Sequence, residues 1–134
     1  MRVVLDANVA AAGIVFRGEP WAVLLKLARR KATAYGSDFT LAETRETVAL
    51  LSRLKKSKAN PGGALAWYLG IVKPIAPAPL GKQRSRDLND DPYLAVALAA
   101  GASIVTYDKD LLDMGKPFGI EILRPSQFLN RFKV

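Results

Sequence analysis

Two residue types with distinctive chemistry, cysteine and histidine, are absent from this sequence of 134 residues. Without cysteine the chain has neither a disulfide framework nor thiolate chemistry, which suits a reducing compartment. Without histidine it has no Ser-His-Asp triad, no paired-imidazole mechanism of the kind used by metal-free ribonucleases, and no zinc site built from His or Cys. Any metal ion must therefore be held by oxygen atoms, which favours hard cations such as Mg²⁺ or Mn²⁺.

Long apolar runs are absent as well. No uninterrupted stretch approaches the roughly 20 residues that a membrane-spanning helix needs. The N-terminal segment MRVVLDAN turns polar at Asp6, before a signal-peptide core of about 7–15 apolar residues can form. We therefore expect a cytoplasmic protein with no membrane partner.

The composition that is present fits a globular chain with an anionic partner. Half of the residues are hydrophobic, which is enough for a core, and we expect a single domain over residues 1–134. Twenty Lys and Arg against twelve Asp and Glu give a formal net charge of +8. The excess favours nucleic acid ahead of a membrane surface, although charge alone is equally consistent with a generic basic surface.

Short strand patterns alternate with helical patterns along the chain. Buried strands are predicted at residues 2–5, 32–35, 71–77, 103–107 and 120–123. Helices are predicted at residues 21–31, 40–56, 64–69, 92–100, 108–112 and 125–132. This alternation predicts an α/β fold whose largely parallel sheet is covered by helices on both faces.

Local signals place the ends of two of these helices. Thr40 and Glu43 have the spacing of a capping box at the start of the helix over 40–56. Pro92 falls in the first turn of the helix over 92–100, and Gly101 follows its end.

Acidic residues are concentrated where the predicted strands end. Asp6 closes the first strand and Asp108 follows the fourth, while Glu43 lies in the first turn of the helix after the second strand. Asp90 just precedes the helix that leads to the fourth strand. Because ligands of open parallel sheets collect at the carboxyl ends of the strands, all four carboxylates can reach one edge of the sheet.

Carboxylates held within a few ångströms of one another repel, and a divalent cation relieves that repulsion. Such a cation activates water and polarises phosphoryl oxygens, so a phosphodiester is the natural substrate. Each acid also has a structural alternative as a helix cap or turn residue, which for any single acid is at least as good an explanation. The convergence of four acids on one edge favours the site.

Four segments, VVLDANV, LAETRETV, NDDPYLAVALAAGASIVTYDKDLL and GIEILRPSQFL, follow one another in an order that resembles the PIN domain family. Within the family they are most similar to the VapC-like toxins of toxin–antitoxin systems. The resemblance implies a three-layer α/β/α PIN-like fold with a central, mostly parallel sheet. It also implies an endoribonuclease, dependent on Mg²⁺ or Mn²⁺, that hydrolyses single-stranded RNA and leaves a 5′-phosphate and a 3′-hydroxyl.

The resemblance assigns the catalytic and metal-binding roles to a quartet: Asp6, Glu43, Asp90 and Asp108. In this assignment Asp6 is the central metal ligand, and Glu43 binds metal or helps to deprotonate the attacking water. Asp91 competes with Asp90 for the third position. We prefer Asp90 because its spacing to Gly101 fits the family pattern, whereas Asp91 suits the N-cap before Pro92.

Further positions are implied around the quartet. Secondary roles, in orienting ligands or adding a metal contact, fall on Asn8, Asp91, Thr106 and Asp110. Tyr107 departs from the glycine or charged residue that many family members have there, and its ring is expected to shape the substrate groove. A basic loop could lie along RNA through Lys82, Arg84 and Arg86, with a solvated loop as an equal alternative.

The sequence also suggests possible protein partners and leaves alternative functions to be considered. Family membership suggests a small antitoxin protein, and a homodimer is plausible if Trp67 and Tyr68 are exposed, although the core is the safer place for Trp67. A non-catalytic RNA-binding or regulatory PIN-like module is the main alternative to a nuclease. Phosphoryl transfer to an aspartate is disfavoured because the segment LDAN lacks the second acid of a DxD motif. Structure-specific DNA cleavage is disfavoured by the lack of an insertion to thread a flap.

Overall fold

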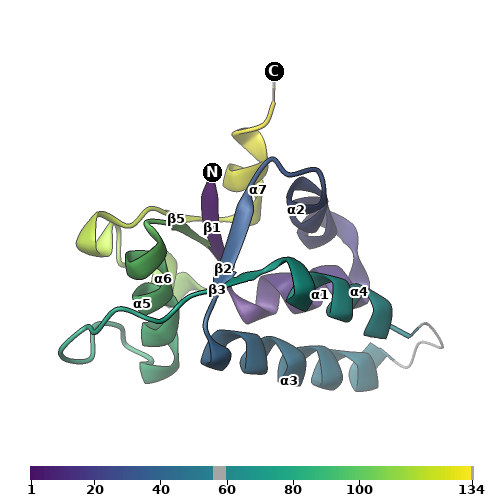
Figure 1. Ribbon diagram of the computed structural model, residues 1–134, viewed down its shortest axis with the longest axis horizontal. Coiled ribbons are helices and arrows are strands. Elements are labelled where there is room, and N and C mark those ends of the chain that lie inside the picture. Colours follow the sequence, from purple (N-terminus) through teal and green to yellow (C-terminus); the bar gives the residue numbers. More distant parts are fainter. Residues whose placement is uncertain (56–59, 134) are drawn as a thin grey trace.

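A computed structural model describes residues 1–55 and 60–133 and contains one five-stranded sheet (Figure 1). The strands are β1 (Arg2–Leu5), β2 (Thr33–Gly36), β3 (Lys73–Pro74), β4 (Ser103–Val105) and β5 (Ile122–Leu123). Their spatial order is β3-β2-β1-β4-β5, and each neighbouring pair is parallel. The predicted α/β class with a parallel sheet is confirmed.

Helices cover both faces of this sheet (Figure 1). One face carries α1 (Ala7–Phe16), α2 (Gly18–Ala28), α3 (Asp38–Lys55), α4 (Gly62–Ile71) and α7 (Pro125–Asn130). The other face carries α5 (Asp91–Ala100) and α6 (Lys109–Leu112). Single 3₁₀ turns are η1 (Leu88–Asp90) and η2 (Pro117–Gly119). In the described ranges, no helix is both long enough and apolar enough to cross a membrane.

The short strands supply residues alternately to the two layers. In β1, Val3 and Leu5 pack with the helices of the first face, whereas Val4 packs against α5. In β4, Val105 belongs to the first cluster and Ile104 to the second. Strands buried on both faces must be apolar throughout, which is why the β-branched run at the N-terminus was readable as a strand.

The helix α1 was missed by the sequence prediction. Its sequence, ANVAAAGIVF, is apolar almost throughout and therefore shows no amphipathic stripe, because α1 is enclosed by the sheet, α2 and α3. The two helices α1 and α2 meet closely at Gly13. A Cβ atom there would lie 2.9 Å from Leu24 Cδ1 and 2.9 Å from the carbonyl of Pro20, so only glycine permits this approach.

The predicted capping box between Thr40 and Glu43 is wrong. Helix α3 begins at Asp38, two residues earlier than predicted, and is capped from Ser37. The Ser37 N–H donates to Thr40 Oγ1 at 2.9 Å, and the Thr40 N–H donates to Ser37 Oγ at 3.4 Å. Glu43 thus lies in the second turn of the helix, and its carboxylate is free of any capping role. The predicted end of this helix, residue 56, lies outside the described residues.

Other boundaries shift by a few residues. Helix α4 is longer than predicted, with Tyr68 fully buried and Trp67 half-buried at the margin of the core, so the two do not form an exposed aromatic patch. Strand β3 is short, since Pro74 cannot donate to the ladder. Strand β4 ends at Val105 rather than Tyr107, and the chain beyond it turns across the end of the sheet.

The chain reverses its direction of travel across the sheet at β1. From β1 it passes through α1 and α2 to β2 on one side, and it later returns through α5 to β4 on the other. In open α/β sheets such a switch point leaves a crevice beyond the carboxyl ends of the strands. In the view of Figure 1, α3 lies beyond the carboxyl ends of β1 and β2.

Candidate active site

A pocket of about 290 Å³ lies at the switch point, beyond the carboxyl ends of β1 and β4. It is lined by Asp6, Ala7, Asn8, Glu43, Thr47, Asp87, Asn89, Asp90 and Asp108. All four acids of the predicted quartet therefore border one pocket. Among the described residues that line it, five are acidic and none is Lys or Arg.

Asp6 is buried in the wall of the pocket, directly after β1. Its Oδ2 atom accepts a hydrogen bond from Thr106 Oγ1 at 2.7 Å. Burial raises the pKa of Asp6, and the charges of Glu43 and Asp108 raise it further against the lowering effect of the Thr106 hydroxyl. A carboxylate in this position is costly to leave charged without a compensating cation.

Thr106, fully buried, links two members of the quartet. Besides donating to Asp6, its Oγ1 atom accepts the backbone N–H of Asp108 at 2.9 Å. Asp108 in turn caps α6, because its Oδ1 atom accepts the N–H of Asp110 at 3.0 Å. The hydroxyl of Thr106 thus fixes the position of Asp6, after β1, relative to Asp108, after β4.

Glu43 reaches the pocket from α3 and is oriented by α5. The hydroxyl of Tyr93 donates to Glu43 Oε1. Burial and this hydrogen bond raise the pKa of the Tyr93 hydroxyl far above its usual range, so it remains a donor. One carboxylate oxygen of Glu43 is engaged by Tyr93.

Asp90 lies in the last position of η1, with 8% of its surface exposed. Its Oδ2 atom is buried and has no hydrogen-bond partner among the described residues. Burial, together with contact and repulsion from Asp108 and the charges of Asp87 and Asp6, raises the pKa of Asp90 to about 7. An unpartnered carboxylate oxygen inside an acidic pocket is the arrangement that a cation would relieve.

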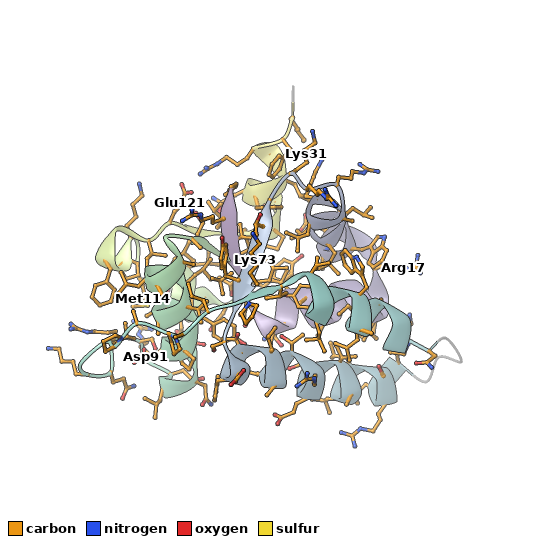
Figure 2. The ribbon with its side chains drawn as sticks, viewed as in Figure 1. Arg17, Lys31, Lys73, Asp91, Met114 and Glu121 are labelled. Atoms are coloured by element: carbon orange, nitrogen blue, oxygen red, sulfur yellow. The ribbon has the colours of Figure 1, made fainter. Side chains whose placement is uncertain are left out.

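Asp91, the competitor for the third position, faces away from this pocket. Figure 2 shows it at the start of α5, beside the preceding loop. Its two carboxylate oxygens accept the N–H of Arg84 at 2.9 Å, the N–H of Ser85 at 2.8 Å and the Ser85 hydroxyl. Although burial acts to raise the pKa of Asp91, the hydrogen bonds from Ser85 and Arg84 lower it. Asp91 anchors a loop and does not serve as the expected side-chain N-cap.

The remaining predicted residues are divided between the pocket and its surroundings. Asn8 is exposed and lines the pocket. Asp110 lies outside it and forms an exposed ion pair with Arg86 at 3.5 Å. The Arg84 guanidinium donates to the Leu80 carbonyl and lies 5.2 Å from the ring of Phe118. The three basic residues Lys82, Arg84 and Arg86 do not line the pocket.

Several pocket residues were not predicted. Asp87 opens the acid-rich segment and could have been included on that ground, and Thr47 follows Glu43 by four residues on the same helix face. Asn89 also lines the pocket. Tyr93 lies 50 residues from Glu43 in the chain, and no local pattern marks their contact.

Comparison with family models bears directly on this arrangement. The model described as the PIN domain matches residues 2–110. The chain belongs to the PIN domain family. This confirms the resemblance drawn from the sequence motifs, and members of the family are generally nucleases. No match was found among curated proteins.

Solved structures share the fold of this PIN domain. A chain of VapBC2 from Rickettsia felis, crystallised with a DNA fragment from their promoter, gives a TM-score of 0.59 at 18% identity, covering 92% of this chain and 98% of that one. PAE2754 from Pyrobaculum aerophilum gives a TM-score of 0.59 at 20% sequence identity, and the match covers 98% of this chain and 88% of PAE2754. A chain of FitAcB from Neisseria gonorrhoeae gives a TM-score of 0.50 at 19% sequence identity, and the match covers 92% of this chain and 98% of that chain. At these identities the likeness establishes the fold alone.

The carboxylates of this PIN domain have the chemistry of a divalent-cation site. Within residues 1–55 and 60–133, no three or more His, Cys, Asp or Glu side chains are already gathered as a closed set of ligands. The five carboxylates that border the pocket nevertheless offer oxygen ligands, and one of their atoms, Asp90 Oδ2, is buried without a hydrogen-bond partner among the described residues. Hard cations that keep several water ligands suit such an open set.

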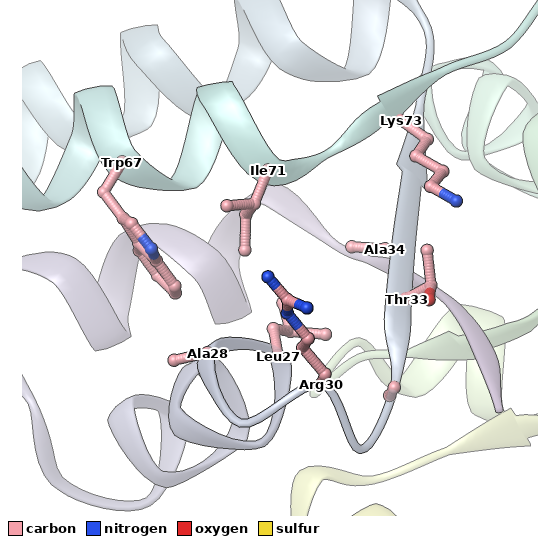
Figure 3. Close-up of a pocket in the computed structure, with 9 residues that line it drawn as sticks. Leu27, Ala28, Arg30, Thr33, Ala34, Trp67, Ile71 and Lys73 are labelled. Carbon is pink, nitrogen blue, oxygen red and sulfur yellow. The ribbon is translucent and has the colours of Figure 1, made fainter.

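A larger cavity, of about 560 Å³, lies near the start of β2, away from the carboxylates (Figure 3). Its polar groups include Arg30, Thr33 and Lys73, while Trp67 and Ile71 from α4 form an apolar side. The residues that line it include no Asp or Glu, so size alone does not make it the catalytic pocket of the PIN domain.

Proposed function

We propose that this PIN domain is a metal-dependent endoribonuclease that hydrolyses phosphodiester bonds of single-stranded RNA, and that it is the toxin of a toxin–antitoxin pair. The observation that carries the proposal is the single pocket bordered by Asp6, Glu43, Asp90 and Asp108. Within it, burial and mutual repulsion raise the pKa of Asp6 and Asp90, and one oxygen of Asp90 has no partner among the described residues.

Mg²⁺ or Mn²⁺ would be held by Asp6, Asp90 and Asp108, with Glu43 as a further ligand or as the base. When bound, the cation supplies a lowered water pKa and polarisation of the phosphoryl oxygens. The positions of Asp6 and Asp108 are maintained by Thr106, which bonds to both residues. Because all four acids are already at the pocket, binding requires side-chain adjustment and no rearrangement of the sheet.

Glu43 is the best-placed residue to accept a proton from the attacking water. Tyr93 donates to Oε1 and orients the carboxylate of Glu43, which lines the pocket, and Oε2 would accept the proton. Water then attacks phosphorus in line and gives a proton to Glu43, and the bond to the 3′-oxygen breaks. The 3′-oxygen takes up a proton from solvent, so the products carry a 5′-phosphate and a 3′-hydroxyl. With no histidine in the chain, most of the base work would fall to the lowered water pKa that the cation supplies, with Glu43 as the helping carboxylate.

Positive charge outside the pocket supports a polyanionic substrate. The chain has a net charge of +8 although the pocket itself is lined by acids. Lys82 and Arg86 are exposed on the loop that Asp91 anchors beside the site, where they would contact RNA phosphates irrespective of sequence, Arg86 by exchanging its exposed ion pair with Asp110. Arg84 is engaged with Leu80 and would contribute less.

A small antitoxin protein is the partner that we propose, acting on the toxin in the cytoplasm. The sequence motifs are similar to those of VapC-like toxins, and the fold is shared with chains of VapBC2 and FitAcB. A small open reading frame beside the gene, and co-purification of its product with this chain, would provide the partner. A toxin without such a neighbour would contradict this part of the proposal.

A homodimer is proposed from the apolar surface beside the pocket. Phe39 and Leu88 are 47% and 65% exposed and border a groove that also includes Leu80 and Pro92. A second copy would cover this surface, whereas a monomer would leave it in water. Sedimentation velocity should show a dimer that Leu88→Glu weakens; a wild-type monomer at all concentrations would contradict it.

Cleavage of end-labelled single-stranded RNA tests the nuclease proposal. Purified protein is assayed with Mn²⁺ or Mg²⁺, with excess EDTA, and as an Asp6→Asn variant whose thermal melt shows a folded chain. We expect cutting that requires metal and falls by about 10³-fold or more in the variant, since the lost charge stabilisation amounts to several kcal/mol.

The controls separate the nuclease from a binding module. End-group analysis should find 5′-phosphates, and double-stranded RNA and single-stranded DNA of the same sequence serve as comparison substrates. RNA binding without metal-dependent cleavage, or cleavage that Asp6→Asn leaves unchanged, would favour the non-catalytic module or a contaminating nuclease.

A further inference from the structure

Tyr107 is an exposed aromatic residue next in the chain to Asp108, which lines the carboxylate pocket. It stands between Thr106, which is fully buried and bonded to Asp6, and Asp108, which lines the pocket. Neighbouring Cα atoms are about 3.8 Å apart, so the ring begins beside the catalytic carboxylates. The Tyr107 side chain nevertheless does not enter the pocket, and the residue is 40% exposed.

The ring is fixed at both of its ends. Its hydroxyl donates to Glu19 Oε1 in the first turn of α2 at 2.8 Å. At the other end its two chain neighbours are held by Thr106 Oγ1, which donates to Asp6 Oδ2 and accepts the N–H of Asp108. An aromatic ring held in place before a ligand arrives loses little conformational entropy on binding.

The surroundings of Glu19 add a cation to this aromatic surface. Arg17, two residues earlier, is exposed, and its guanidinium lies 4.8 Å from the centre of the Trp21 ring. The start of α2 thus carries the exposed Arg17 and, through Glu19, contacts the exposed ring of Tyr107. Proteins that bind single-stranded nucleic acid use this combination, with rings for the bases and cations for the backbone.

We propose that Tyr107 stacks on a nucleobase adjacent to the scissile phosphodiester and so sets the position of the RNA strand in the site. The inference rests on the proposed function. It gives the pocket a substrate-positioning residue besides its carboxylates. Every base has a π-face, so the contact fixes register without demanding one particular base.

The hydrogen bond to Glu19 also permits a purely structural role, in which Tyr107 braces the β4–α6 connection against α2. Three variants distinguish the two roles. Tyr107→Phe removes the hydroxyl and keeps the ring, Tyr107→Trp keeps a stacking surface, and Tyr107→Leu keeps apolar bulk without a π-face. Glu19→Ala removes the acceptor of the Tyr107 hydroxyl and leaves the ring in place, so it is the matched control for the hydrogen bond.

The experiment uses a fluorescently labelled RNA oligonucleotide with one mapped cleavage site. Binding is measured by anisotropy in EDTA, where no cleavage is expected, and kcat/KM is measured with Mn²⁺. A set of matched oligonucleotides carries a single abasic position at each of the nucleotides flanking the cut. The abasic scan finds which base, if any, contributes to binding.

If stacking operates, Tyr107→Leu weakens RNA binding about tenfold. The affinities of Tyr107→Phe and Tyr107→Trp for the same RNA stay within about threefold of wild type. One abasic position should weaken wild-type binding by about tenfold and have no further effect in Tyr107→Leu, because the two changes remove the same contact. Thermal melts of all variants report any loss of folding.

Two results overturn the inference. In the first, wild type cleaves RNA with metal but Tyr107→Leu binds as tightly as wild type. In the second, the effects of the abasic position and of Tyr107→Leu multiply, which shows that they are independent. A wild-type protein that does not cleave RNA would instead refute the proposed function, and without it the inference as well.

Discussion

Asp90 and Asp91 are adjacent in the chain and equally buried, with 8% of each exposed, yet their surroundings are opposite. Asp91 accepts hydrogen bonds from the backbone and side chain of Ser85 and from the Arg84 N–H, and its pKa is lowered. Asp90 has an oxygen without a partner among the described residues, and burial together with the neighbouring acids raises its pKa to about 7.

Asp91 is a carboxylate that stabilises the fold, whereas Asp90 is a carboxylate that the fold leaves free to bind a cation. Burial alone is not diagnostic, because both residues have it. What distinguishes them is whether the charged form is satisfied within the protein. The account therefore predicts that the two neighbours respond oppositely to the same substitution, Asp to Asn.

The largest expected difference is in catalysis. Asp90→Asn should reduce metal-dependent RNA cleavage by about 10²-fold or more, because an amide is a poorer ligand for a hard cation. Asp91→Asn should retain activity within about threefold wherever it is folded, since Asp91 does not line the pocket. Rates at saturating Mn²⁺ measure both, and equal losses in the two variants would remove the distinction.

Stability should show the reverse order. Asp91→Asn places an NH₂ group against a backbone N–H of the loop and should cost about 2 kcal/mol of unfolding free energy, measured by urea denaturation at pH 7. The interactions that lower the pKa of Asp91 stabilise the folded chain fully above pH 3.8, its ordinary pKa, and this contribution is lost as the pH falls through the lowered pKa. The stability difference between wild type and Asp91→Asn should therefore narrow below about pH 4. An unchanged midpoint would show that the loop does not depend on this anchor.

The link between the carboxylates can be broken at Thr106. Thr106→Val keeps the shape but loses the donor to Asp6 and the acceptor for the Asp108 N–H, and should cost about 1–2 kcal/mol of stability. Cleavage should fall by roughly tenfold because the carboxylates lose their mutual alignment. Thr106→Ser retains the hydroxyl and is expected to recover most of both losses; if it behaves like valine, the hydroxyl is not the cause.

The smallest effect concerns the pH dependence of the metal-free protein. A folded-state pKa near 7 means that the folded chain binds a proton that the unfolded chain has lost above about pH 4, so wild-type stability should decrease as the pH rises from 5 to 8. Solvent in the pocket screens the repulsion, and we expect wild type to lose about 1 kcal/mol relative to Asp90→Asn over this range. Denaturation in EDTA at both pH values measures it, and parallel pH profiles would argue against repulsion at Asp90.

Much of this arrangement was predictable from local pattern. The β-branched runs gave the parallel strands, and the position of Asp6 and Asp108 at strand ends placed them at one edge, where the structure also puts Glu43 and Asp90. Helix α1 was not predictable in this way, because a helix enclosed on most sides has no polar face to show its period.

The contacts that orient the carboxylates also could not be predicted from the sequence. Thr106 meets Asp6 across 100 residues and Tyr93 meets Glu43 across 50, so both depend on how the strands and helices are placed. The role of Asp91 depends on the backbone path at Arg84 and Ser85, which no residue pattern specifies. Residue types indicated the proposed chemistry, and long-range packing determines which acids border the pocket.

Mn²⁺ binding to the folded protein tests the central claim most directly, because it requires neither RNA nor turnover. Isothermal titration of wild type, Asp90→Asn and Asp91→Asn at pH 8 compares the two neighbours under one condition. The account predicts that wild type and Asp91→Asn bind with similar affinity and that Asp90→Asn binds about tenfold or more weakly. Retained binding in Asp90→Asn, with loss in a folded Asp91→Asn, would contradict it.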